Sequence, residues 1–145
     1  MIPKFRSWVE NVRHPKFSFM QYEPEFNGEI NKIFEKNGEI QHGVKVSYMQ
    51  STGLKDKNGV EVYEGDCFIK IFRTIEIPTG KNGIEKSVGI VKFHEGAFQV
   101  RIDGWGYELL SEVVQPHIYG ANNDYWENIV IGNIYENPEL LEVEG

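Results

Sequence analysis

Histidine and cysteine side chains suit metal binding and nucleophilic chemistry best, and this chain holds few of them. No two of the four histidines lie one helical turn apart along the chain: they are His14, His42, His94 and His117. With Cys67 as the single cysteine, no zinc-type ligand spacing occurs, although a site assembled across the fold stays open. To act as a nucleophile, Cys67 would need a histidine that folding brings beside it. Because Cys67 begins an apolar stretch, we expect a buried, unreactive thiol.

Carboxylates and glycine-rich loops do not indicate a specific catalytic, calcium-binding or nucleotide-binding site either. The chain has 22 acidic residues, so some carboxylate pair for acid–base catalysis is available in any fold. The segment Asp56-Lys-Asn-Gly59 begins like a calcium-binding loop, but Glu61 and Cys67 stand where that loop needs Gly and Glu. It predicts a hairpin turn at Asn58-Gly59 instead. The two common glycine-rich nucleotide-binding motifs are absent from the sequence. We therefore expect no catalytic residues, no metal site and no cofactor.

Aromatic side chains in and beside the predicted loops are the best candidates for contacts with a ligand or an interface. On small β-barrels, loop aromatics stack on bases or grip peptides. The alternative is that they close the ends of the barrel or pack a subunit interface, where Trp and Tyr are enriched. We favour a core or interface role over a ligand platform. The candidates are Trp105, Tyr107, Tyr119, Tyr125 and Trp126.

The elements that must position these residues are short apolar stretches between glycine-rich turns. Strands are expected at residues 4–9, 44–49, 60–63, 67–77, 86–94, 97–102, 107–114 and 129–131, and no segment from 43 to 135 needs to be helical. Residues 29–42 fit a helix or a hairpin, and we favour the hairpin because Asn37-Gly38 accepts positive φ. Asn137 as N-cap and Pro138 as first helical residue predict a short C-terminal helix.

The order of the strands predicts the fold class. A long hairpin followed by a tight turn and two further strands is typical of a mainly β, SH3-like small barrel or roll. Closing the sheet removes edges that such apolar strands would otherwise expose. We expect residues 49–145 to form this barrel and residues 1–48 to form a variable, β-rich N-terminal extension.

Composition limits the function classes further. The 145-residue chain is 40% hydrophobic, which is ordinary for a globular protein, and its formal net charge of −7 works against binding a phosphate backbone. A local basic patch remains compatible with that total. We find no apolar run of about 18 residues and no signal-peptide core, so we expect no membrane partner. One cysteine forms no intrachain disulfide, which fits a cytoplasmic location.

Five segments carry a family resemblance. The long ones are Met49-Gln-Ser-Thr-Gly-Leu-Lys-Asp-Lys-Asn-Gly59 and Ile131-Gly-Asn-Ile-Tyr-Glu-Asn-Pro-Glu-Leu-Leu141, and the short ones are Lys4-Phe-Arg-Ser-Trp8, Val62-Tyr-Glu-Gly-Asp66 and Gly89-Ile-Val-Lys-Phe93. In this order they resemble the YopX family of phage and prophage proteins. Residues 10–48 match least. Val9-Glu10-Asn11 stands where the family commonly has an Asp and a polar turn.

The resemblance implies a mainly β protein with an SH3-type barrel, without an established activity or assigned catalytic residues to carry over. The motif residues themselves suggest structural roles: the glycines fit turns, and Tyr63, Phe93, Ile134 and Tyr135 are expected to pack the barrel. Our hypothesis is a non-enzymatic binding or assembly module in the bacterial host cytoplasm. It would act through protein–protein contacts, by self-association or with a host or phage protein.

The alternative hypothesis is a nucleic-acid-binding barrel that uses the loop aromatics. Two further alternatives are a DNA mimic, for which a net charge of −7 is mild, and an enzyme. An enzyme would need an acid–base site that the linear sequence hides.

Overall fold

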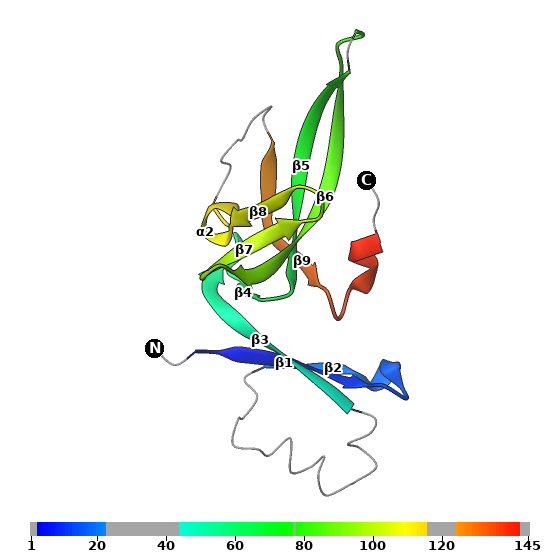
Figure 1. The fold of residues 1–145 in the computed structure, drawn as a ribbon, viewed down its shortest axis with the longest axis vertical. Coiled ribbons are helices and arrows are strands. Elements are labelled where there is room, and N and C mark those ends of the chain that lie inside the picture. Colours follow the sequence, from blue (N-terminus) through cyan, green and yellow to red (C-terminus); the bar gives the residue numbers. More distant parts are fainter. Residues whose placement is uncertain (1–2, 23–43, 77, 116–123, 143–145) are drawn as a thin grey trace, which may run out of the picture. The chain divides into compact units, whose positions relative to one another are not determined.

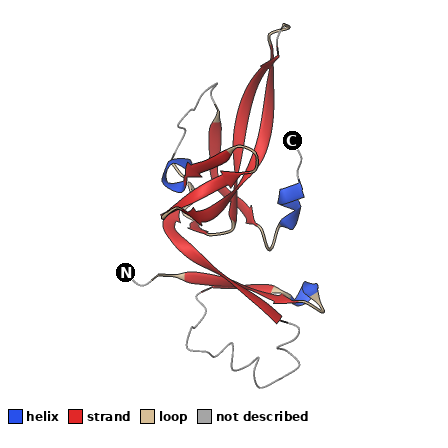
Figure 2. Ribbon diagram, in the orientation of Figure 1, coloured by secondary structure: helices blue, strands red, loops and turns tan. Residues whose placement is uncertain are grey.

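The computed structural model describes residues 3–22, 44–76, 78–115 and 124–142, and within them the protein is mainly β (Figures 1 and 2). The predicted hairpin over residues 29–42 and the candidate Tyr119 lie outside the described residues. The chain divides into two compact units, Met1–Ser51 and Thr52–Gly145. The boundary predicted after residue 48 falls within a strand that belongs to both units.

The first unit is an antiparallel sheet in which β1 (Phe5–Asn11) lies between β2 (Phe19–Tyr22) and the first part of β3 (Val44–Lys55). A 3-10 turn, η1 (Pro15–Phe17), lies between β1 and β2. The backbone N–H of Asn11 donates to Ser18 Oγ at 2.9 Å, which fixes the ends of this connection. The strand predicted at residues 4–9 is thus confirmed.

The second unit begins with a hairpin and continues into a five-stranded antiparallel sheet. In the hairpin, the end of β3 pairs with β4 (Glu61–Tyr63) through the predicted turn, where Gly59 has φ of 81°. The sheet has the order β8-β7-β6-β5-β9. Its strands are β5 (Asp66–Glu76), β6 (Lys81–His94), β7 (Ala97–Ile102), β8 (Gly106–Leu109) and β9 (Tyr125–Asn133).

The sheet curls around its own core, as the ribbon of Figure 1 shows. Gly89 on β6 permits this curvature, because a Cβ there would lie 2.7 Å from Trp126 Cη2 and would also overlap Val100 Cγ1. The backbone of β6 can therefore approach both side chains closely. The buried cluster consists of Val62, Phe68, Val91, Val100, Ile102, Leu110, Val113 and Trp126.

Two predictions need correction. Residues 107–114 do not form one strand: β8 ends at Leu109, and a one-turn helix, α2 (Leu110–Val113), follows. Leu110 and Val113 are three residues apart, so one helical turn buries both on the same side, and this packing gain decides the structure. Phe93 was expected in the core, but it is 55% exposed near the end of β6, whereas Tyr63 is buried as predicted.

The C-terminal segment forms a 3-10 helix, η3 (Pro138–Glu142), at the place where a short helix was expected. The backbone N–H of Leu140 donates to Asn137 O at 3.0 Å, three residues back, which is the 3-10 pattern.

Candidate functional site

The Asp56 carboxylate organises the β3–β4 turn and ties it to β9. Oδ1 accepts the backbone N–H groups of Asn58 and Val60, both at 2.9 Å, and Oδ2 accepts that of Val130 at 2.9 Å. Val130 is available because the β5–β9 register is irregular here: β5 advances from Cys67 to Ile69 while β9 passes from Gly132 to Glu127. The buried carboxylate is therefore committed to backbone donors.

A second motif turn connects β4, β5, β6 and the segment after β9. Asp66 Oδ2 accepts the backbone N–H of Tyr63 at 2.8 Å. Between them, Gly65 has φ of 87°, donates its N–H to Val91 O and accepts from the N–H of Ile134 at 3.0 Å. Gly65, in a left-handed conformation, thus joins β6 to the segment after β9. This indicates a structural role for the Gly65-Asp66 pair.

The C-terminal motif holds η3 against the sheet. Asn137 Oδ1 accepts the backbone N–H of Asn133 at 3.2 Å, and Asn133 Oδ1 accepts those of Tyr135 and Glu136. Gly132 is necessary for this contact, because a Cβ there would lie 2.5 Å from Asn137 Oδ1. The long motifs therefore shape the backbone. Within the described ranges, no three His, Cys, Asp or Glu side chains gather as a metal site would require, and no helix is long and apolar enough to cross a membrane.

Two of the candidate aromatics, Trp105 and Trp126, meet around the ammonium group of Lys70. Lys70 Nζ lies 5.8 Å from the centroid of the Trp105 ring, 5.6 Å from that of Trp126 and 5.3 Å from that of Phe72. It also donates to Glu108 Oε2 at 2.6 Å. Trp126 is the register partner of Lys70 on β9, so the two side chains share one face of the sheet.

This cluster is a clamp: the Lys70–Glu108 pair and the rings around it join β5 to the terminal strand β8. The side chain of Lys70 is 10% exposed and that of Glu108 is 35% exposed. A lysine so far from water needs the carboxylate, and the ring faces add favourable cation–π contacts. Since the ammonium group is already paired, the geometry suits a structural tie that holds β8 to β5 better than a free nucleophile.

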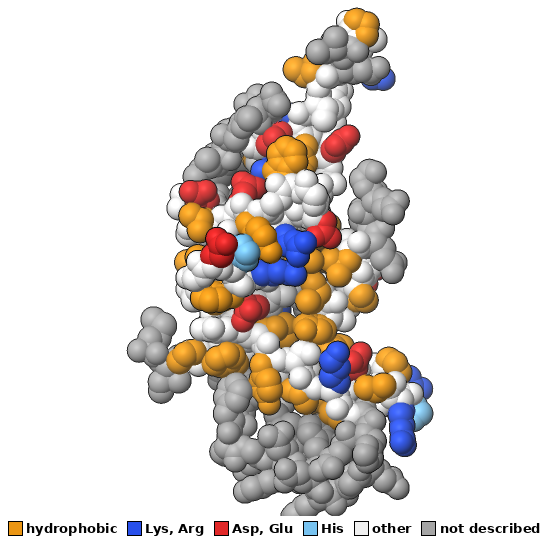
Figure 3. All heavy atoms as spheres, viewed as in Figure 1, with side chains coloured by type: hydrophobic (Ala, Val, Ile, Leu, Met, Phe, Trp, Pro, Cys, Tyr) orange, Lys and Arg blue, Asp and Glu red, His pale blue; other side chains and the backbone are white. Residues whose placement is uncertain are grey.

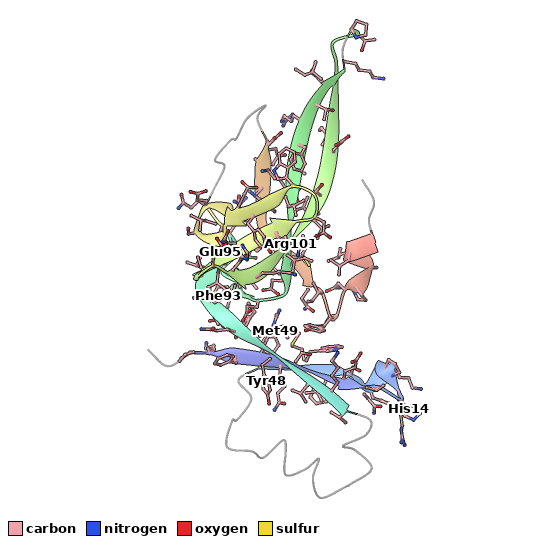
Figure 4. The ribbon with its side chains drawn as sticks, in the orientation of Figure 1. His14, Tyr48, Met49, Phe93, Glu95 and Arg101 are labelled. Atoms are coloured by element: carbon pink, nitrogen blue, oxygen red, sulfur yellow. The ribbon has the colours of Figure 1, made fainter. Side chains whose placement is uncertain are left out.

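Tyr107 and Tyr125 lie on the opposite face of the sheet. Tyr107 stacks on His94 with ring centroids 3.9 Å apart and an angle of 3° between the planes. Arg101 Cζ lies 5.9 Å from the Tyr107 ring, and Arg73 Cζ lies 5.7 Å from the Tyr125 ring. Figure 3 shows Lys and Arg side chains beside a histidine and apolar groups on this face, and Figure 4 labels Arg101 on β7. The candidate aromatics that were predicted as one group therefore lie on two faces of the sheet, Trp105 and Trp126 on one and Tyr107 and Tyr125 on the other.

One of the two terminal strands of the sheet, β8, exposes apolar side chains together with the turn before it. In the described part of the chain, β8 has a strand neighbour on one side only, β7. Trp105, Tyr107 and Leu109 are 62%, 37% and 45% exposed. We call these three residues, with the backbone of β8, the β8 edge.

Sequence reasoning missed the Lys70–Glu108 pair. A signal was present, because Phe68, Lys70 and Phe72 alternate along one strand, and the two flanking phenylalanines mark that side as the inner face. A lysine at an inward position needs a partner. Nothing in the sequence indicated that the partner lies 38 positions away on β8.

The comparison with family models identifies the family. The family model described as YopX protein matches residues 4–142. The chain is also similar to a solved structure, the crystal structure of protein EF1440 from Enterococcus faecalis. That protein is 25% identical, with 97% of this chain and 99% of that chain covered and a TM-score of 0.46. No curated protein matches the chain. Since the matched residues span nearly the whole sequence and include every motif above, this chain belongs to the YopX family.

Proposed function

We propose that this protein is a non-enzymatic binding and assembly module of a phage or prophage, and that it acts in the bacterial cytoplasm by docking a second copy of itself at the β8 edge. The observation that carries this proposal is a terminal strand of the sheet that exposes apolar side chains beside its unpaired edge. Such an edge is a template for adding another strand, and its Trp and Tyr are residue types enriched at interfaces.

The surroundings of β8 support docking because they hold the edge in one conformation. The Lys70–Glu108 pair ties β8 to β5 from the inner face, and the His94 ring packs flat on Tyr107 from the outer face. A pre-ordered edge loses less conformational entropy on association. The carboxylates of the family motifs, Asp56 and Asp66, are bonded to backbone N–H groups, which supports a non-enzymatic role.

We further assign the second unit to the SH3-like barrels. Strands β5 to β8 form a meander, a one-turn helix follows, and β9 returns to pair with β5. A five-stranded, strongly curled sheet in which the last strand returns to the first is the pattern of that class.

Analytical ultracentrifugation over a wide concentration range tests the assembly. We expect a concentration-dependent dimer, and Leu109→Lys should abolish it by placing a charge on the edge. Ile84→Lys is the matched control, because Ile84 is also apolar and exposed (60%, against 45% for Leu109) but lies on β6, away from the β8 edge. A monomer at every concentration, or equal loss of dimer in both variants, would refute the proposal.

The cation–aromatic pairs favour one second candidate, nucleic-acid binding by the outer face. Arg101 with Tyr107 and Arg73 with Tyr125 offer rings for base stacking beside positive charges. Fluorescence anisotropy with labelled single- and double-stranded oligonucleotides at low salt tests it. Binding that Tyr107→Ala and Arg101→Gln both weaken would support this candidate, and no binding at low salt would remove it.

A further inference from the structure

A pocket of about 210 Å³ lies in the second unit, between β6, β7 and η3. Val88 and Ile90 of β6 contribute apolar side chains from one face of the strand, and Leu140 and Leu141 of η3 form the facing wall.

The C-terminal motif builds one wall of the pocket. Gly132 allows Asn137 to contact the backbone of β9, and a Cβ at Gly132 would also lie 3.0 Å from Leu140 Cδ1. The N–H of Leu140 is in turn bonded to Asn137 O. The leucine wall is therefore held in position without a ligand, which lowers the entropic cost of binding one.

Charge at the pocket is opposite in sign to that of the whole protein. Lys86 and Arg101 line it, together with one carboxylate, Asp103. Two positive side chains and one negative one leave a local charge of +1, on a chain whose formal total is −7. The ion pair between Arg101 and Asp103 is weak, because Arg101 Nε lies 3.4 Å from Asp103 Oδ1 and the Asp103 side chain is 90% exposed. Arg101 therefore keeps its capacity to attract another anion.

The size and polarity of the pocket define the ligand class. A volume of about 210 Å³ accommodates one branched apolar side chain with a small polar group. A local charge of +1 matches a monoanion, and the two cationic side chains of the lining, Lys86 and Arg101, suit a carboxylate.

We propose that this pocket binds a carboxylate carried on a branched apolar body, the chemistry of a leucine-like residue at a peptide C-terminus. The apolar body lies between β6 and η3, and the carboxylate faces Lys86 and Arg101. This site goes beyond the assembly at the β8 edge, and neither proposal needs the other.

Titration of the ¹⁵N-labelled full chain with N-acetyl-leucine, followed by NMR, tests the site. We expect saturable shifts at Val88, Ile90 and Leu140, and much weaker binding of N-acetyl-leucinamide and N-acetyl-glycine. Lys86→Gln should weaken N-acetyl-leucine by about fivefold, the value of an exposed charge pair. Lys92→Gln is the matched control, since Lys92 shares the strand and face of Lys86 but does not line the pocket.

A peptide amide distinguishes the source of the carboxylate. N-acetyl-Leu-Glu-amide carries its carboxylate on a side chain, and it should bind more weakly than N-acetyl-leucine if a chain terminus is the ligand. The proposal is overturned if the acid and the amide of N-acetyl-leucine bind equally, if no saturable shift occurs, if the shifts map away from the pocket, or if Lys92→Gln weakens binding as much as Lys86→Gln.

Discussion

Replacing Asp56 with alanine best tests whether its carboxylate stabilises the β3–β4 turn or serves in binding or catalysis. The change removes the carboxylate that accepts three backbone N–H groups, those of Asn58, Val60 and Val130. The three N–H groups then lose their carboxylate acceptor in a region that is buried, as Asp56 itself is. If the turn closes the fold, the loss must appear as a loss of stability.

The magnitude follows from the hydrogen bonds. A bond to a charged acceptor contributes about 1.5 kcal/mol or more, and the three share one acceptor group, so we expect Asp56→Ala to cost about 4 kcal/mol. For a protein of this size that corresponds to a fall of about 8–16 °C in Tm. Asp56→Asn keeps one acceptor oxygen and turns an amide N–H toward Val130 N–H, so it should cost about 2 kcal/mol.

Urea unfolding followed by far-UV circular dichroism measures these differences. Asp103→Ala is the control, because Asp103 is almost fully exposed and makes one long ion pair, and its variant should stay within about 0.5 kcal/mol of the parent. An Asp56→Ala protein as stable as the Asp103→Ala protein would refute the structural interpretation of the turn. It would then favour a role for this carboxylate in binding or catalysis.

Three other changes test separate contacts. Gly89→Ala should destabilise the protein by about 2 kcal/mol in the same urea assay, because its Cβ would overlap Trp126, and an unchanged midpoint would show that the sheet relaxes easily. Glu108→Gln should cost about 2 kcal/mol by leaving Lys70 buried without its carboxylate, whereas adding Lys70→Met should recover most of that loss; additive losses would contradict the clamp. Cys67 is fully buried, so its thiol should react with a disulfide reagent only after unfolding, and rapid reaction in the native protein would contradict that placement.

Local signals explain which parts of the fold were predictable. Asn58-Gly59 and Glu95-Gly96 determine their own turns, since the backbone there needs positive φ, and both turns are observed. Strands with alternating apolar residues, such as Ala97–Ile102, were predicted with the correct bounds. β6 begins at Lys81, five residues earlier than predicted, because pairing with β5 extends a polar segment that has no apolar pattern.

Long-range contacts explain what the sequence could not show. The apolar residues of α2 fit a strand or a helix equally well, and only packing against the core selects one helical turn. The five aromatic candidates appeared to form one group, but alternation along β9 sends Tyr125 and Trp126 to opposite faces. Asp56 was identified as a turn residue, but its bond to Val130, 74 positions away, depends on the irregular register of β9.

Hydrogen–deuterium exchange at low and high protein concentration tests docking at the β8 edge most directly. If a second copy adds at this edge, the amides of residues 105–109 become more protected as concentration rises, while those of the β5–β6 tip keep their exchange rates. Leu109→Lys should remove the concentration dependence. Exchange at residues 105–109 that is the same at every concentration, or new protection confined to another surface, would contradict the account.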